Sequence, residues 1–134
     1  NNIIEFITIA SMGNSQDFGD LTAVRRFAGA TSSTTRGVFI AGYNPSATNT
    51  IDFVSIQTTG NATDFGDLTT FKDNTAGNSN GTRATFSGGS TNTGSNVTLN
   101  VIDYVTVATP GNAADFGDLL GTTESATGTS GTAA

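Results

Sequence analysis

The stretch Gly-Asn-Ala-Thr-Asp-Phe-Gly-Asp-Leu at 60–68 decides how the rest of this chain is interpreted. Nearly the same sequence occurs at 13–21 (GNSQDFGDL) and at 111–119 (GNAADFGDL). We call each copy the phrase. The second copy follows the first by 47 residues, and the third follows the second by 51. A repeat at this nearly constant spacing predicts a chain built from tandem copies of one supersecondary unit.

Each copy of the phrase follows a run rich in β-branched and aromatic residues, which is a composition typical of strands. The three runs are 4–9, 51–56 and 102–107. A second type of run, at 35–42 and 82–89, comes after the first two phrases and ends in glycine. The four extra residues of the longer spacing fall in one connection, after the second of these runs.

The run at 51–56 is apolar on both faces of a strand, since Ile51 and Phe53 point one way and Val54 and Ile56 the other. A strand buried on both sides fits a small sheet between two neighbours, as in a β-propeller blade. No stretch shows the 3.6-residue period of a helical repeat. The sequence therefore predicts an all-β fold of tandem four-stranded blades, one about every 47 residues.

The 134 residues are expected to form a single repeat domain with units at roughly 3–49, 50–100 and 101–134. The last unit stops before a third run of the 35–42 type. Its segment 120–134 has almost no bulky apolar residue, so we expect it to be weakly structured. About 2.5 blades cannot close a propeller of roughly four to eight. Other copies of the chain, or further repeats of a longer one, are expected to complete it.

An apolar strand that ends in paired glycines, here Gly88-Gly89, resembles the kelch repeat. The sequence at 35–43 and at 51–69 resembles more closely a repeat of bacteriophage virion proteins, notably of marine cyanophages. The resemblance covers 3–119. It implies a kelch-like propeller in a tail-fibre or capsid-decoration protein on the virion surface. Other virion proteins and a host-surface glycan are the partners implied. The kelch tryptophan is absent, because the chain has no Trp.

The composition excludes several kinds of function. The net charge is −6, and the five basic residues form no patch, so no nucleic-acid binding is expected. With no Cys and no His, the chain has no thiol or imidazole chemistry and no zinc site of that type. No apolar run is long enough to cross a membrane. Catalysis needs unlike residues, whereas the phrase repeats the same ones. We therefore expect no enzyme, no catalytic residue and no cofactor.

The acidic residues of the phrase allow two interpretations. One is a Ca²⁺ site, but Ca²⁺ takes six to eight oxygen ligands and one phrase supplies two carboxylates. The other, which we favour, is a structural turn with φ > 0 at Gly13, Gly60 and Gly111 and with Asx-type hydrogen bonds. The calcium candidates are Asp17, Asp20, Asp64, Asp67, Asp115 and Asp118. The structural candidates are Phe18, Phe65 and Phe116, packed between units, and Gly19, Gly66 and Gly117, where the chain turns again.

Three residues are candidates for ligand binding. Arg36 and Arg83 begin equivalent runs, and they either face a ligand or pair with an aspartate of the phrase. We favour the ion pair, because arginine binds carboxylates in a bidentate manner. Tyr43, just after Gly42, is a candidate for stacking on a sugar. The pair at 25–26, with Lys72 as its counterpart, is expected on a solvated face.

The function expected from the resemblance is a non-enzymatic virion structural protein that attaches to a host surface. Two alternatives remain open. One is a secreted, lectin-like propeller made by oligomerisation of this chain. The other is a self-assembling β fibre, which exposed strand edges and low charge would favour.

Overall fold

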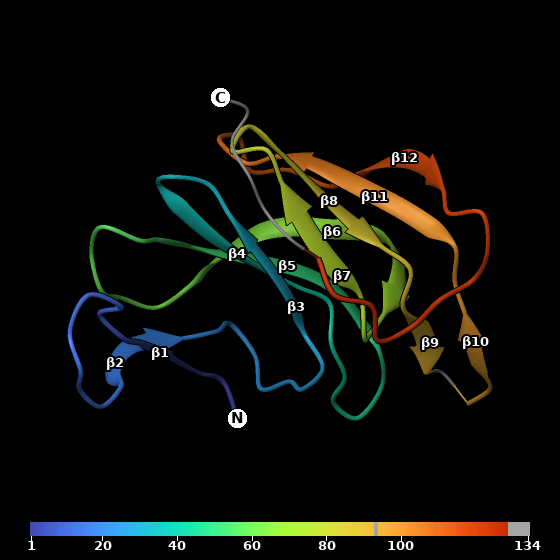
Figure 1. Cartoon of the computed structure of the whole chain (residues 1–134). Coiled ribbons are helices and arrows are strands. Elements are labelled where there is room, and N and C mark those ends of the chain that lie inside the picture. The colour runs from blue at the N-terminus through green and yellow to red at the C-terminus, as the bar shows by residue number, and fades with distance from the viewer. Residues whose placement is uncertain (93, 129–134) are drawn as a thin grey trace.

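The structure, a computed structural model, describes residues 1–92 and 94–128. These residues form an all-β arrangement of antiparallel sheets, as the sequence predicted (Figure 1). Within them, no helix is long and apolar enough to span a membrane. The strands are β1 (Ile3–Phe6), β2 (Gln16–Asp20), β3 (Gly29–Ser32), β4 (Arg36–Ile40), β5 (Thr48–Ser55), β6 (Thr63–Lys72), β7 (Ala76–Ser79), β8 (Arg83–Ser87), β9 (Ser90–Asn92), β10 (Asn96–Thr98), β11 (Val101–Thr106) and β12 (Ala114–Asp118).

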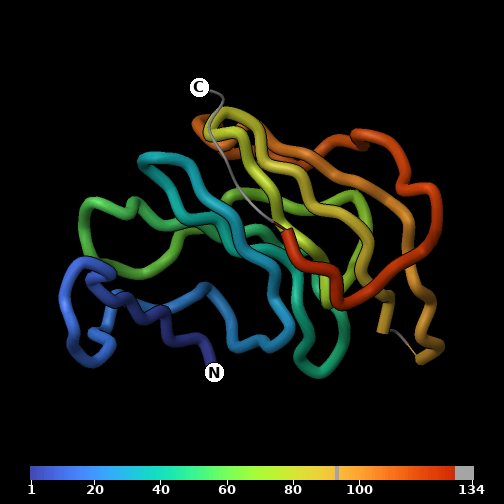
Figure 2. The backbone as a smooth tube through the Cα atoms, in the orientation of Figure 1, coloured from blue at the N-terminus to red at the C-terminus, as the bar shows by residue number. Residues whose placement is uncertain are grey.

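Two four-stranded sheets have the same strand order. The first sheet is β3-β4-β5-β6, and the second sheet is β7-β8-β11-β12. The leading hairpin, β1 with β2, corresponds to the last two strands of each sheet. Each sheet therefore joins the end of one sequence unit to the beginning of the next. Figure 2 shows the two sheets side by side, with the leading hairpin at one end.

Residues 16–20, 63–68 and 114–118 of the phrase form strands, and for this part the expectation of a loop is wrong. The opening Gly-Asn of each copy lies outside the strands. β2, β6 and β12 are these strands, and each pairs with the β-rich run before it. A bulge lies at the same place in each pair, and it leaves the phenylalanine without an opposite residue. The next residue is Gly19, Gly66 or Gly117, with φ of 148°, 142° and 137°. These glycines allow the bulge, and they do not turn the chain.

The core lies between the two sheets. β5 is buried on both faces, as expected, with Ile51 and Val54 inside. Each fully buried aliphatic or aromatic side chain contributes about 1.5–3 kcal/mol. The first sheet supplies Val38, Ile40, Ile51, Phe65 and Leu68, and the second supplies Ala84, Phe86 and Val105, with Val107 directly after β11.

The first strands of the two sheets, β3 and β7, run close together. A Cβ atom on Gly77 in β7 would lie 2.5 Å from the carbonyl oxygen of Ala30 in β3. A Cβ atom on Gly29 would lie 2.7 Å from the oxygen of Thr75. Only glycine permits this approach, which explains why these strands contain small residues.

The four extra residues of the second spacing belong to a hairpin. β9 and β10 pair with each other between β8 and β11. In the first sheet, a shorter connection with a cis Asn44–Pro45 bond joins β4 to β5. Residues 120–128 form no strand. The remainder of the segment expected to be weakly structured, 129–134, lies outside the described residues.

Candidate functional site

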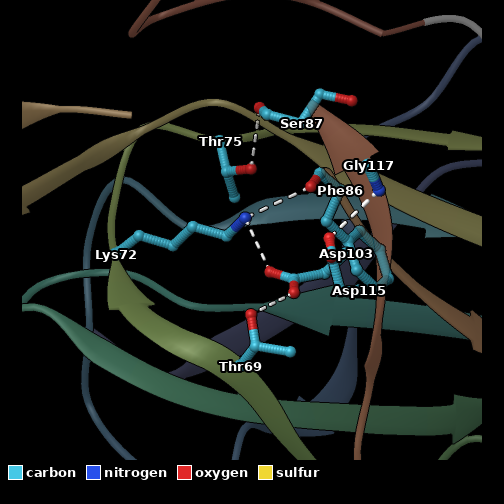
Figure 3. A network of polar contacts seen from close by, with 8 residues as sticks. All are labelled: Thr69, Lys72, Thr75, Phe86, Ser87, Asp103, Asp115 and Gly117. Carbon is cyan, nitrogen blue, oxygen red and sulfur yellow. Dashed lines mark hydrogen bonds and ion pairs between the residues drawn. The ribbon is translucent and has the colours of Figure 1, made fainter. Parts of the chain in front are cut away.

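A buried ion pair connects the two sheets. The ammonium of Lys72, at the end of β6, lies 2.8 Å from a carboxylate oxygen of Asp103 in β11 (Figure 3). Both side chains are fully buried. The hydroxyl of Thr69 donates to the other carboxylate oxygen of Asp103, and the ammonium also donates to the carbonyl oxygen of Phe86 at 3.2 Å. The last strand of the first sheet is thereby fixed to the middle of the second.

The same arrangement connects the segment that follows β2 to the first sheet. Arg25 lies 2.8 Å from Asp52 of β5, and both side chains are buried. The hydroxyl of Thr22 donates to the other oxygen of Asp52 at 2.7 Å. Thr22, Arg25 and Asp52 occupy the repeat positions of Thr69, Lys72 and Asp103. We call these two sets the inter-unit ion pairs.

Burial lowers the pKa of the Lys72 ammonium below its ordinary value of 10.5. The hydrogen bond and the charge of Asp103 act in the opposite direction but do not reverse this effect. The cation is therefore held by its partner in a place that water does not reach. Removal of one partner would leave an unpaired charge in the core.

The glycine and asparagine that open the phrase make a second inter-unit contact. We call 13–15, 60–62 and 111–113 the GN turns. The Oδ1 atom of Asn112 accepts a hydrogen bond from the amide of Asp67 in β6 at 3.1 Å. The amides of Gly111 and Ala113 donate to the carbonyl oxygens of Phe65 and Asp67 at 2.7 and 2.8 Å. The GN turn at 111–113 therefore binds the edge of the preceding unit's phrase strand, β6.

The GN turn at 60–62 repeats these bonds on β2. Asn61 accepts from the amide of Asp20 at 3.0 Å, and the amide of Gly60 donates to Phe18 at 2.7 Å. These asparagines thus bind another unit rather than their own turn. The glycines Gly13, Gly60 and Gly111 do not have positive φ, contrary to expectation. Nothing in the structure explains why glycine stands there.

The aspartates of the phrase do not gather. Among residues 1–92 and 94–128, no three acidic side chains come together in a cluster that could hold a metal ion. Asp115 accepts a hydrogen bond from the amide of Gly117 at 3.0 Å, which is the expected Asx-type contact. The phenylalanines Phe18, Phe65 and Phe116 each meet an aromatic ring of the paired strand edge to face, at Phe6, Phe53 and Tyr104.

Arg36 and Arg83 do not pair with the aspartates of the phrase, so this expectation is wrong. The guanidinium of Arg36 lies 4.5 Å from the ring centre of Phe53, and that of Arg83 lies 4.6 Å from the ring centre of Tyr104. Arg36 also donates to the carbonyl oxygen of Val107, across the sheets, at 2.8 Å. The cation–π contact replaces the carboxylate because the strand pairing places an aromatic residue beside each arginine.

Tyr43 lines a hollow of about 350 Å³. The guanidinium of Arg26 lies 4.9 Å from the Tyr43 ring centre, and Asn44 donates to the carbonyl oxygen of Val24 at 3.0 Å. Arg26 is exposed, as expected for 25–26, but Arg25 is buried, contrary to it. An aromatic ring, a guanidinium and an amide are groups that can recognise a polar ligand. The full lining is Asn1, Val24, Arg25, Arg26, Tyr43, Asn44 and Pro45.

The inter-unit ion pairs were missed from the sequence, although a signal for them exists. Asp52 and Asp103 stand inside apolar runs, where a charged residue needs a buried partner. A threonine follows each of the first two phrases, and a basic residue comes three positions later, at Arg25 and Lys72. Comparison of the chain with models of protein families gives no match, and comparison with curated proteins also gives none.

Proposed function

We propose that the chain is a non-enzymatic structural protein of a bacteriophage particle, in a tail fibre or a capsid decoration, and that it attaches to a host-surface glycan. The resemblance of the phrase and of the two strand runs to virion repeats supports the proposal that the chain is part of a bacteriophage particle. The use of the repeated polar residues supports the structural role. Asp52 and Asp103, for example, are bound in ion pairs between units.

We further propose that the two sheets are blades of a kelch-like propeller. Their identical strand order and the close approach of β3 and β7 support this arrangement. In a propeller, the first strands of successive blades gather around a central axis. The leading hairpin would then be the outer half of a third blade.

The surface that we propose for the glycan is the hollow beside Tyr43. The single observation that carries this choice is the exposed Arg26 guanidinium over the Tyr43 ring, next to an asparagine amide. Sugars are bound by an aromatic face together with polar donors. No basic patch or metal is needed for this kind of recognition.

The test is binding of the labelled 134-residue chain to an array of bacterial surface glycans. Tyr43→Ala should abolish binding to any glycan that the wild type retains. Phe71→Ala, which removes an exposed aromatic side chain outside the hollow, should leave it unchanged. Immunogold labelling of phage particles with an antibody to the chain tests whether the chain is part of the particle. Glycan binding without particle labelling would instead favour the secreted lectin.

A further inference from the structure

We propose that a second copy of this chain binds head to tail, with its GN turn at 13–15 on the free edge of β12. The proposal rests on contacts between units of this chain and does not depend on the proposed function. Two GN turns already bind the phrase strands β2 and β6. Within the described residues, no GN turn follows β12 and no phrase strand precedes 13–15.

The glycines of the bulge show that the edge of β12 is open. A Cβ atom on Gly66 would lie 2.5 Å from the backbone of Gly111, because a GN turn covers it. A Cβ atom on Gly117 would meet nothing within 4 Å. The two glycines have nearly the same φ, so the backbone of β12 already has the conformation that binds a turn in β6.

Apolar side chains are exposed at both ends, at positions that are buried where the two four-stranded sheets meet. Phe116 is 52% exposed, whereas its counterpart Phe65 is 3% exposed. At the other end, Ile7 is 61% exposed and corresponds to Val105, which is 4% exposed. Ile9 is almost fully exposed and corresponds to the buried Val107. Phe65, Val105 and Val107 belong to one core cluster between the sheets. The two ends therefore carry the two halves of that contact.

The hydrogen bonds of the junction follow from the repeat. The amides of Gly13 and Ser15 would donate to the carbonyl oxygens of Phe116 and Asp118, as those of Gly111 and Ala113 do on β6. The Oδ1 atom of Asn14 would accept from the amide of Asp118, as Asn112 does from Asp67.

Arg83 and the space beside it complete the binding face. Arg36, its counterpart, donates to the carbonyl oxygen of Val107 in the next sheet. Arg83 would therefore donate to Ile9 of the second copy. A hollow of about 340 Å³ lies beside Arg83, Thr85 and Phe116. We assign this hollow to the isoleucine side chains of the second copy.

One part of the inner contact is missing from the junction. The repeat position of Lys72 is Thr123, and that of Asp103 is Glu5. The backbone of Thr123 is nevertheless in place, because its carbonyl oxygen accepts from Gly89 at 2.8 Å, as that of Lys72 does from Gly42 at 3.1 Å. The junction lacks an ion pair, so we expect reversible association. A head-to-tail contact gives a ring if the rotation closes and a filament if it does not.

The test is sedimentation velocity of the full chain over a range of concentrations. The wild type should form species larger than 13.6 kDa as the concentration rises. Ile9→Glu blocks one end and Phe116→Glu blocks the other, so each variant alone should remain monomeric. A mixture of the two should form a 1:1 dimer, because it still contains one intact pair of ends. Val97→Glu, which charges an exposed apolar residue of β10, should associate as the wild type does.

Thermal unfolding of each variant, followed by circular dichroism, checks that loss of association is not loss of the fold. A monomeric wild type at every concentration would overturn the proposal. So would a mixture of folded Ile9→Glu and Phe116→Glu chains that gives no dimer, or association of either variant alone.

A gain of affinity gives a second test. Thr123→Lys supplies a cation at the position of Lys72, facing Glu5 of the second copy. It should tighten association roughly threefold to tenfold, as coupled charges in contact do. The gain should disappear in the Glu5→Gln background. An equal gain in both backgrounds would show that Thr123 and Glu5 do not meet, and would contradict the proposed register.

Discussion

Asp103 in β11 and Lys72 at the end of β6 form an ion pair 2.8 Å long with both side chains fully buried. The two residues belong to different sheets, and Asp52 with Arg25 repeats the relationship one unit earlier. The positions nearest to the ends of the repeat, Glu5 and Thr123, do not form it. The pair therefore marks a contact between units and is not a feature of every unit.

Asp103→Ala should lower the free energy of unfolding by about 3–5 kcal/mol, because the Lys72 ammonium would remain buried without a partner. Asp64→Ala, which removes an exposed carboxylate of the phrase, should change it by less than about 0.5 kcal/mol. Urea unfolding followed by circular dichroism measures both. If the two variants lost similar amounts of unfolding free energy, burial of the ion pair would not explain its contribution to stability.

The buried lysine should also make stability depend on pH. Its pKa in the folded protein lies below the ordinary value of 10.5, which we take for the unfolded chain. Between the two values, the unfolded chain binds more protons at this group, so the free energy of unfolding rises with pH in that window. Lys72→Arg keeps the cation at all accessible pH values, because arginine is effectively always protonated, and should remove this rise. The difference between the two proteins, measured from pH 7 to 10.5, isolates the lysine. A difference that does not change with pH would contradict the lowered pKa.

Phe65→Ala should cost about 3–5 kcal/mol, since the side chain lies in the core between the sheets. Phe116→Ala removes the equivalent ring from the third copy of the phrase, where that ring is exposed. At low concentration, where the chain is monomeric, it should cost less than about 1 kcal/mol. Thermal or urea unfolding of the two variants compares them directly. A larger loss for Phe116 would mean that the phrase acts within its own hairpin and not between units.

Gly66→Ala and Gly117→Ala separate backbone strain from close approach. Both place a side chain on a residue with φ near 140°, so backbone strain destabilises both variants. Gly66→Ala adds a contact with the backbone of Gly111 that no real Cβ atom tolerates. We expect it to destabilise the monomer more than Gly117→Ala, by urea unfolding. Equal losses would show that the GN turn moves aside without cost.

Much of the fold could be predicted because the repeat and the strand composition are visible in the sequence. The run at 51–56 lies largely in β5, and the run at 35–42 contains β4. β3 and β7 gave no apolar signal, because the close approach of their backbones selects small residues. The glycines of the phrase suggest turns, which predicts a loop. Strand pairing uses them in a bulge instead.

The contacts of the charged residues could be predicted only in part. Arg36 was expected to bind an aspartate, but the register of β4 and β5 places Phe53 nearby. Arg25 and Arg26 are neighbours in the sequence, yet one is buried and the other exposed. Adjacent residues in an extended segment point in opposite directions, so composition alone does not determine which of them enters the core.

The hairpin of β9 and β10 shows where this architecture accepts new sequence. It adds length between β8 and β11, and yet Asp103 still reaches Lys72 as Asp52 reaches Arg25. Growth of that connection therefore leaves the register of the larger sheets undisturbed. A foreign peptide inserted in this connection would be displayed on the scaffold as a graft, and successive units could diverge there while the rest of the sequence stays fixed.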